Sequence, residues 1–450
     1  MMIRHFLTSI LGERTPEIFV TGNGSLPSVF PVTDLAVGVF GAVGAAVNEL
    51  LVTAGHAPGE ISVDRRRASQ WFTSSIRPNG WAIPSPWDPI AGDYRTIDGW
   101  IRLHTNAPRH RRAALSVLHA DADADSVSAA VARWHATDLE AAIVEAGGCA
   151  AKMQTRSEWE GSEAGISVRS EPLIHWASNG HSRSIPTIDD PTQPLRNIRV
   201  LDLTRVLAGP ASTRFLALIG ADVLRVDPPW WEEPALIPDM MLGKRSVRLD
   251  LRVAQNREKF LDLLSGADVL VHGYRPGALD SLDLGHAVRQ DARPGLIETS
   301  LSAYGWSGPW AGRRGFDSLV QMSTGIAEAG MRVTKSEKPA PLPVQAIDHS
   351  TGYLMAYATI RSLTHALRTG EGSDAQLSLA RTARLLTDVE PSLPGPGISE
   401  ADENDFSGVS ELTSWGPASR IKVPLSVSQV SFQSEIPARQ LGSDTLSWRD

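Results

Sequence analysis

One aspartate in this chain stands at the start of a long apolar segment. Asp348 is followed by apolar side chains that recur at helical spacing from Tyr353 to Leu367, and Gly370 and Gly372 separate this helix from a short strand at 375–379. A carboxylate at a helix N-terminus can be a structural cap, because the free N–H groups and the helix dipole stabilise the anion. It can equally be a nucleophile that is held ionised within reach of a substrate. The local sequence leaves both interpretations open.

A second stretch near residue 34 has the same layout. Asp34 is followed by Gly38 as Asp348 is by Gly352, and each pair opens an apolar helix, a glycine-containing turn and a short strand. There are only two copies and they lie far apart, which favours an internal duplication over a repeat array. Residues 1–70 are therefore interpreted as a partial duplicate of the segment around Asp348.

Several common catalytic and metal-binding motifs are absent from the sequence. The first strand-to-helix turn, Val206 to Pro210, is not a G-x-G-x-x-G loop, and the chain has no P-loop lysine motif and no G-x-S-x-G elbow. Nicotinamide dehydrogenases, nucleotide hydrolases and serine hydrolases are therefore disfavoured. His104 and His110 do not have the spacing of metal ligands, so we predict no metal site.

Alternating strands and helices indicate the architecture. Strands are expected at 198–203, 221–226, 248–251, 268–271 and 296–301, with helices between them, which predicts an α/β fold with a parallel sheet and ligands at the carboxyl ends of its strands. A hairpin at Asp98-Gly99 and three helical segments after it predict a smaller α/β domain. The expected order is a partial duplicate (1–70), a small α/β domain (71–176), a linker (177–196), a Rossmann-like domain (197–390), and an acidic, proline-rich segment with a closing tail (391–450).

Composition narrows the class of protein. The 450 residues carry a net charge of −8, an apolar fraction of 42% and one cysteine, Cys149. This acidic balance argues against nucleic acid or a membrane surface as partner, and a single cysteine excludes an internal disulfide. No signal peptide and no run of about 20 apolar residues is recognised, so a cytoplasmic protein is expected.

Seven sequence motifs resemble those of the class III CoA-transferase family, which includes formyl-CoA and carnitine CoA-transferases and the acyl-CoA racemases. They occur in family order at 200–210, 220–226, 243–251, 267–271, 274–277, 302–309 and 348–372. The resemblance implies the family's fold, a Rossmann-like parallel sheet with a smaller α/β domain. It also implies coenzyme A or acyl-CoA as substrate, a small carboxylic acid as second substrate, no covalently bound cofactor and a homodimer.

The resemblance also assigns roles to residues. Asp348 matches the family's nucleophile, which forms a mixed anhydride with the acyl group and then an aspartyl-CoA thioester; the helix N-terminus is expected to keep it ionised. Nine residues match positions that cradle CoA, and the two arginines suit its phosphates: Leu207, Ala208, Leu249, Arg252, Gly273, Tyr274, Arg275, Ser302 and Tyr304.

The chain departs from the family in two respects. The Asp-helix and small domain precede the Rossmann-like half instead of following it, so Asp34 lacks a CoA-binding segment before it and is interpreted as a structural cap. Where the racemases have Gly-His-Asp, this chain has Gly315-Phe316-Asp317, and phenylalanine moves no proton. We therefore expect a CoA-transferase; an acyl-CoA racemase or isomerase and a catalytically silent CoA-binding protein are the alternatives.

Overall fold

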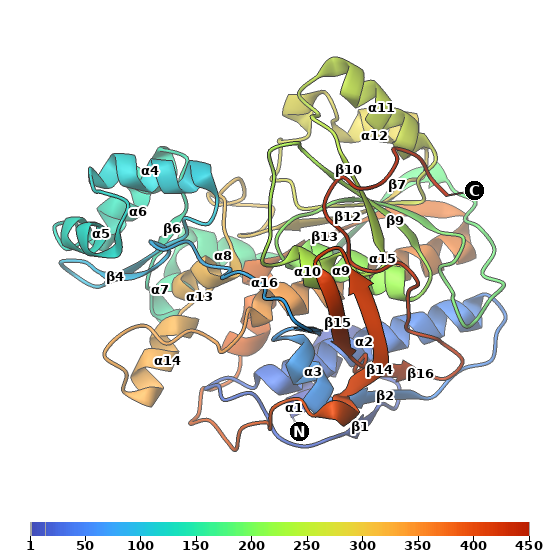
Figure 1. Cartoon of the computed structure of the whole chain (residues 1–450), viewed down its shortest axis with the longest axis horizontal. Coiled ribbons are helices and arrows are strands. Elements are labelled where there is room, and N and C mark those ends of the chain that lie inside the picture. Colours follow the sequence, from blue (N-terminus) through green and yellow to red (C-terminus); the bar gives the residue numbers. More distant parts are fainter. Residues whose placement is uncertain (1, 14, 450) are drawn as a thin grey trace.

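A seven-stranded sheet forms the centre of the computed structural model, which describes residues 2–13 and 15–449 (Figure 1). The strand order is β10-β9-β8-β11-β12-β13-β7, and every neighbouring pair is parallel except β13 and β7. The predicted α/β fold with a largely parallel sheet is confirmed. The strands are β7 (His175–Ser182), β8 (Arg199–Leu203), β9 (Asp222–Asp227), β10 (Lys244–Arg248), β11 (Val269–His272), β12 (Ile297–Ser302) and β13 (Glu371–Ser378).

Alternating side chains on the strands cover the sheet on both faces. Val200 and Val269 pack into one core with α9 and α15, while Leu201 and Leu270 pack into another core against α11. A period of two is expected where successive side chains point to opposite faces of a strand. The helices are α9 (Ala208–Leu218), α10 (Ile237–Met240), α11 (Ala254–Ser265), α12 (His286–Ala292) and α15 (Ala346–Thr369).

The two similar stretches fold alike and pack against each other. Helix α2 (Val32–Thr53) is followed by β2 (Ile61–Asp64) and α3 (Arg65–Trp71), as α15 is followed by β13 and α16 (Leu379–Thr387). Helix α2 lies along α15, on the side away from the sheet (Figure 1). Both helices open on the same backbone geometry, with φ and ψ of −76° and 61° at Pro31 and −75° and 63° at Gln345.

Segments from the two ends of the sequence share two small sheets. Strand β2 lies between β1 (Phe19–Thr21) and β16 (Leu425–Val427), and β15 (Gly416–Ile421) lies between β3 (Ile76–Pro78) and β14 (Phe406–Thr413). Helix α1 (Met2–Leu11) packs on α2. Residues 71–78, assigned from the sequence to the small domain, therefore belong with the tail, because β3 takes its hydrogen bonds from β15.

A separate lobe carries the predicted hairpin. Its core extends from Ile90 to Ala150, and its sheet consists of β4 (Gly92–Arg95), β5 (Trp100–Leu103) and β6 (Ala150–Lys152). In Figure 1 this lobe projects to the left of the central sheet. The remaining helices are α4 (Pro108–Leu118), α5 (Ala124–Val131), α6 (Ala136–Glu145), α7 (Arg156–Gly161), α8 (Glu163–Ser170), α13 (Asp317–Ser323) and α14 (Ile326–Thr334), with short 3-10 turns at Asp280–Leu282 and Glu403–Asp405.

Three expectations from the sequence are wrong. The linker at 177–196 begins inside β7, an exposed edge strand that pairs with β13. The strand expected at 248–251 lies four residues earlier, at Lys244–Arg248, where it pairs with β9. Helix α2 is long and apolar enough to cross a membrane by length and composition, contrary to the expectation that no such segment exists; 78% of its most apolar window is buried inside the protein.

Candidate active site

The order of the strands creates a switch point between β8 and β11. From β8 the chain adds β9 and β10 on one side, and it then returns to the other side with β11 and β12. In such sheets the loops at the carboxyl ends of the two diverging strands separate and leave a crevice. Thr204 follows β8 and Gly273 follows β11, and both line a cavity of about 340 Å³.

Buried ion pairs hold the turn after β8. Val206 has a φ of 67°, a conformation that is unfavourable for a β-branched residue, and its N–H donates a 2.6 Å hydrogen bond to Glu233. The other carboxylate oxygen of Glu233 forms an ion pair with the guanidinium group of Arg225, at an N–O distance of 2.9 Å. Asp202, at the end of the same strand, accepts hydrogen bonds from the backbone N–H and the hydroxyl of Thr204. The turn is thereby held in one conformation, from which Leu207 and Ala208 lead into α9.

Two glycines allow the turn, α9 and α15 to approach one another. A Cβ atom on Gly209 would lie 2.3 Å from Thr204, and one on Gly352 would lie 2.3 Å from the carbonyl oxygen of Ala208. Neither position has room for a side chain, because real Cβ contacts are longer than this. The close approach brings the first turn of α15, which carries Asp348, to the edge of the same cavity.

Asp348 occupies a buried and electrostatically unfavourable position for an anion. It is the third residue of α15, its side chain makes no capping hydrogen bond, and only 7% of its surface is exposed. Burial raises the pKa of Asp348 well above its usual value, and the neighbouring Asp317 raises it further. Contrary to the expectation from the sequence, burial and Asp317 outweigh the helix N-terminus, where Gln345 is the N-cap residue and Asp348 lies in the first turn.

Asp317 forms a pair with Asp348. Its carboxylate accepts a 2.8 Å hydrogen bond from the backbone N–H of Asp348 and a 2.5 Å hydrogen bond from the amide of Gln321. Burial raises the pKa of Asp317 to about 6, although these hydrogen bonds act in the opposite direction. Two carboxyl groups this close cannot both ionise without a large cost, so the pair binds a proton more tightly than isolated carboxyl groups do.

Asp34 occupies the equivalent position of α2 but has a different electrostatic environment. It is also the third residue of its helix, and Arg65 lies 3.0 Å from its carboxylate. Arg65 is the first residue after the strand that follows α2, and the corresponding residue after β13 is Leu379, which lines the cavity beside Asp348. Asp34 makes no capping hydrogen bond with its side chain, so it is an ion-paired residue rather than the cap expected from the sequence.

Six of the nine residues predicted to cradle CoA line the cavity together with Asp348: Leu207, Ala208, Gly273, Tyr274, Arg275 and Ser302. The other three lie outside the set that lines this cavity. Leu249 is buried in the core against α11. Tyr304 is buried and its hydroxyl lies 3.1 Å from Ser323. Arg252 is exposed, bonds Asp250 and stacks on Trp230.

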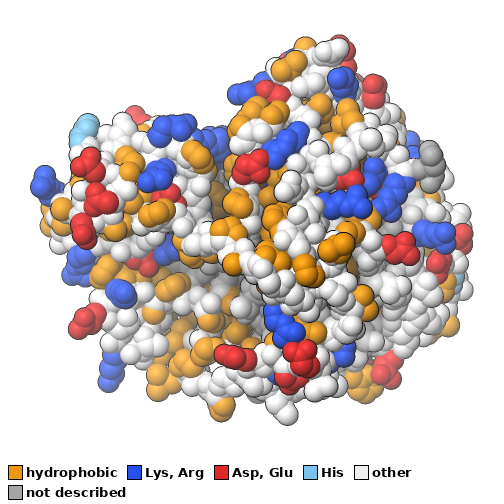
Figure 2. All heavy atoms as spheres, in the orientation of Figure 1, with side chains coloured by type: hydrophobic (Ala, Val, Ile, Leu, Met, Phe, Trp, Pro, Cys, Tyr) orange, Lys and Arg blue, Asp and Glu red, His pale blue; other side chains and the backbone are white. Residues whose placement is uncertain are grey.

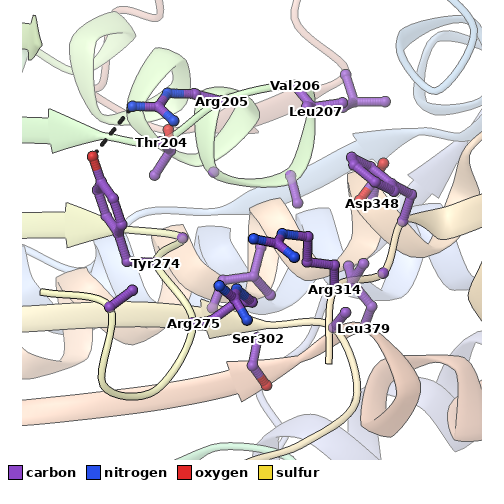
Figure 3. A pocket seen from close by; sticks show the side chains of 18 of the residues that line it. Thr204, Arg205, Val206, Leu207, Tyr274, Arg275, Ser302, Arg314, Asp348 and Leu379 are labelled. Atoms are coloured by element: carbon purple, nitrogen blue, oxygen red, sulfur yellow. Dashed lines mark hydrogen bonds between the residues drawn. The ribbon is translucent and has the colours of Figure 1, made fainter. Parts of the chain in front are cut away.

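Four further arginines, which no sequence motif indicates, also line this cavity: Arg109, Arg205, Arg313 and Arg314. Burial lowers the pKa of Arg109 and of Arg275, and the positive charge of Arg314 is the next contribution to both. In Figure 3 the side chains of Arg275 and Arg314 lie close together between Tyr274 and Asp348. The arginines therefore gather several positive charges around this cavity, and Asp348 is the one carboxylate among the described residues that line it. Such an excess of positive charge makes an anion-binding site.

The arginines come from both sides of a recess. Figure 2 shows the surface hollowed between the lobe of α4 to α6 and the lobe that carries α11 and α12, with Lys and Arg side chains on its rim. Arg109 lies on α4, Arg275 follows β11, and Arg314 precedes α13. No sequence motif joins these positions, because the chain brings them together only through the packing of the small lobe against the sheet.

A second cavity of about 570 Å³ meets the first at Asp348. Both cavities are lined by Asp348, Phe316, Val206 and Leu207. The second cavity extends from there between apolar side chains of the loop at 83–87, of α10 and of the segment before α15. Asp348 thus lies where an arginine-lined cavity and an apolar one join.

Two histidines reach this region from the small lobe. His104 stacks on Phe316 with ring centroids 3.7 Å apart and lines the second cavity, while His110 lines the first. Burial lowers the pKa of His104 to about 3 and that of His110 to about 4, so both rings are neutral at neutral pH. Among the described residues, no cluster of three or more histidine, cysteine or acidic side chains could hold a metal ion.

The similarity of this chain to known proteins is concentrated in its central part. Residues 195–396 match the model of CoA-transferase family III. The chain is 34% identical over 212 residues to the probable fatty acyl-CoA transferase Rv3272 of Mycobacterium tuberculosis, covering 43% of this chain and 52% of the relative. It is 29% identical over 259 residues to the succinyl-CoA–L-malate CoA-transferase alpha subunit of Chloroflexus aurantiacus, covering 52% of this chain and 56% of the relative.

Two solved structures are also similar. The crystal structure of Rv3272 is 33% identical, with a TM-score of 0.41, over 44% of this chain and 56% of that one. A CaiB/BaiF family protein from Brucella suis is 25% identical, with a TM-score of 0.39, over 50% of this chain and 65% of that one. This chain spans about half the length of the curated relatives it matches. The segment that holds Asp348 and most of the residues around the cavity at the switch point is therefore similar to CoA-transferase family III.

Proposed function

We propose that this protein transfers coenzyme A from an acyl-CoA thioester to a carboxylic acid, with Asp348 as the covalent nucleophile. The observation that carries the proposal is the position of Asp348 at the junction of the two cavities. The arginine-lined cavity suits the phosphates of coenzyme A, since guanidinium groups pair with phosphate oxygens. The second cavity leaves room for the acyl group, so a thioester carbonyl between them would lie beside the carboxylate.

The first half of the reaction exchanges the donor acid for the enzyme carboxylate. A carboxylate oxygen of Asp348 attacks the thioester carbonyl, the C–S bond breaks, and coenzyme A leaves as the thiolate. The thiolate then attacks the Asp348 carbonyl of the mixed anhydride, which releases the donor as a carboxylate and leaves an aspartyl-CoA thioester. Covalent catalysis of this kind divides one difficult transfer into easier steps.

The second half runs the same steps with the acceptor. The acceptor carboxylate attacks the aspartyl thioester and again displaces the CoA thiolate. The thiolate attacks the acceptor's carbonyl in the new anhydride, which gives the product thioester and regenerates the Asp348 carboxylate. An anhydride survives only where water is excluded, and the 7% exposure of Asp348 supports that requirement.

The Asp317–Asp348 pair must lose its proton before the first attack. Only the carboxylate is nucleophilic, whereas burial and mutual repulsion favour the protonated form. The gain in return is reactivity, because a carboxylate with a raised pKa and little solvation is a stronger nucleophile than one in water.

Trapping the intermediate tests the proposal. The purified protein is mixed with a panel of acyl-CoA thioesters and treated with hydroxylamine or borohydride, and the modified residue is located by peptide mass spectrometry. We expect the modification on Asp348 and none in Asp348→Asn. A modification on Asp34 would reverse the roles of the two copies. Binding of coenzyme A without modification by any thioester would contradict covalent transfer and favour a silent CoA-binding protein.

One observation keeps an acyl-CoA isomerase as the second candidate. Phe316 stands where the racemases have histidine, but His104 stacks on that phenylalanine and lines the cavity that Asp348 also lines. A histidine and a carboxyl group around one α-carbon could exchange its proton. Incubation of acyl-CoA in deuterium oxide distinguishes the two activities, since exchange at the α-carbon without transfer to an acceptor would favour the isomerase.

A further inference from the structure

We infer that the second cavity selects an acyl group with an uncharged, apolar tail and rejects a dicarboxylic acyl group. The inference rests on the proposed function for the site, and it concerns which thioesters that site accepts. The relatives named above include both a fatty acyl-CoA transferase and a succinyl-CoA transferase, so similarity alone does not separate these two classes of substrate.

The walls of the second cavity are largely apolar. Its side chains come from the loop after α3, the loop before β4, α10 and the segment before α15, and they include Phe72, Ile83, Trp87, Leu236, Met240 and Val344. An apolar tail would complete the burial of these side chains from water, and each methylene group that it buries should tighten binding about fourfold.

No cation among the described residues that line this cavity could pair with a second carboxylate. Neither lysine nor arginine is among them. Its two histidines, His104 and His349, are neutral at neutral pH, because burial lowers the pKa of each to about 3. The polar side chains that line it, such as Ser74, Ser85 and Asn106, are neutral hydrogen-bond donors, and a buried carboxylate that has no cation as partner is disfavoured.

The charges that do line the cavity are negative. Asp239 stays ionised: burial acts to raise its pKa, but Arg214 and Arg420 lower it to about 2. Both arginines lie behind the cavity wall and are occupied, Arg214 with Asp239 and Tyr353 and Arg420 with Asp239 and Glu411. Asp239 is thus neutralised by its partners and offers a second carboxylate no cation, while the Asp317–Asp348 pair repels such a carboxylate once it has lost its proton.

The contrast between the two cavities also fixes the orientation in which acyl-CoA would bind. Five arginines line the first cavity and none lines the second. The phosphates of coenzyme A therefore belong in the first cavity and the acyl tail in the second. The terminal group of the acyl chain then points between the loop at 83–87 and α10, away from all five arginines.

Unreactive thioethers test this inference separately from catalysis. S-hexyl-CoA and S-(5-carboxypentyl)-CoA have chains of matched length and differ in the terminal carboxylate, and neither has a carbonyl that Asp348 could attack. Calorimetry on the full chain should show the neutral analogue binding at least about 10-fold more tightly. Equal affinities, or tighter binding of the carboxylate analogue, would overturn the inference. If neither analogue binds, the proposed CoA site fails and the inference fails with it.

Introducing a cation should reverse the preference. Leu236→Lys on the wall and Ile83→Lys in the adjacent loop each place an ammonium group in the second cavity, and both positions are only partly buried, so the variants are expected to fold. Either variant should bind the carboxylate analogue more tightly than the neutral one. Val409→Lys adds the same charge at an exposed position outside the cavity and should keep the original ratio. An unchanged ratio in both cavity variants would contradict the assignment.

The experiments distinguish failure of the proposed CoA transfer from failure of the inference about the acyl group. If Asp348 is never modified by any thioester but the two thioethers still differ about 10-fold in affinity, covalent transfer is wrong and the class of acyl group still holds. If Asp348 is modified equally by hexanoyl-CoA and by a dicarboxylic acyl-CoA, covalent transfer holds and the inference about the acyl group is wrong.

Discussion

The backbone N–H of Asp348 donates a hydrogen bond of 2.8 Å to the carboxylate of Asp317, which joins the start of α15 to the start of α13. The same contact places two buried carboxyl groups beside each other, so that the charge of one raises the pKa of the other. Structure and reactivity therefore depend on one pair of side chains, and the pair titrates as a unit.

Asp317→Asn should shift the pH dependence of the transfer rate. In the wild-type protein the rate should rise with pH as the pair, whose raised values include about 6 for Asp317, loses its proton. The amide oxygen can still accept the N–H of Asp348 but carries no charge, so the rising limb should move to lower pH. Stopped-flow rates of CoA release between pH 4.5 and 8.5 measure this shift; an unchanged limb would show that Asp317 does not act on Asp348.

The same variant should change stability in a pH-dependent way. A carboxyl group whose pKa is raised in the folded state stabilises the fold while it is protonated, and this contribution is lost as pH rises through about 6. Asp317→Asn has no such loss, although its amide N–H faces the donor of Gln321 at every pH, so the stability of the variant relative to the wild type should rise between pH 4 and pH 8. Urea unfolding at pH 4, 6 and 8 gives the comparison.

Asp348→Asn should abolish transfer while leaving the fold and CoA binding intact. The amide keeps the shape of the carboxyl group but is no nucleophile, so we expect a loss of roughly 10,000-fold or more in the rate of exchange. Asp34→Asn is the matched control, since Asp34 has the same position in α2 and pairs with Arg65. It should keep exchange within about twofold and cost at most about 1 kcal/mol of stability. Equal losses in both variants would contradict the assignment.

Arg314→Ala and Arg275→Ala should each weaken CoA binding. A hydrogen bond to a charged group contributes about 1.5–3 kcal/mol, so removing one phosphate contact should raise the Kd roughly 10- to 100-fold. Arg252→Ala is the control, because Arg252 is exposed and bonded to Asp250, outside the cavity. Calorimetry with CoA and with dephospho-CoA would also show which phosphate each arginine contacts. A stronger effect in Arg252→Ala would restore the role expected from the sequence.

Gly352→Ala should destabilise the protein and disturb the site together. Its Cβ would lie 2.3 Å from the carbonyl oxygen of Ala208, so α9 and α15 would have to separate. Overpacking of this kind costs about 1–3 kcal/mol, and the displaced first turn should lower the transfer rate as well. Gly161→Ala in α7 meets no neighbouring atom and is expected to leave stability within about 0.5 kcal/mol. Thermal unfolding of both variants makes the comparison.

The sequence indicated the sheet and Asp348 because both depend on local patterns. The alternation from 198 to 301 predicted parallel strands, and Asp348 could be singled out by its place before an apolar helix. Its electrostatics could not be predicted, because they depend on Asp317, 31 residues earlier, and on burial by other elements. Arg109 and Arg314 were missed for the same reason: 205 residues separate them, and only the packing of the small lobe brings them together.

The errors have equally local causes. Strand β7 was assigned to a linker because HWASNGHS is polar and exposed, and its partner β13 lies almost 190 residues later. Leu249 and Arg252 were assigned to the CoA site by resemblance to the family, but Leu249 is buried in the core against α11 and Arg252 bonds Asp250. A homodimer and a cytoplasmic location remain predictions; native mass spectrometry and fractionation of cells would test them.

Helix α2 packs on α15 and β16, which are synthesised much later than α2 itself. On a ribosome, α2 emerges long before its packing partner α15: about 290 residues separate the two helices, which at 5–20 residues per second takes roughly 15–60 s. During that time the 22 residues of α2 have only α1, β2 and α3 available among the main elements that pack on them in the folded chain, and α15, α16 and β16 are still missing. Nascent chains stalled before residue 346 should therefore bind a chaperone that recognises apolar segments, and release should follow the synthesis of α15 and β16.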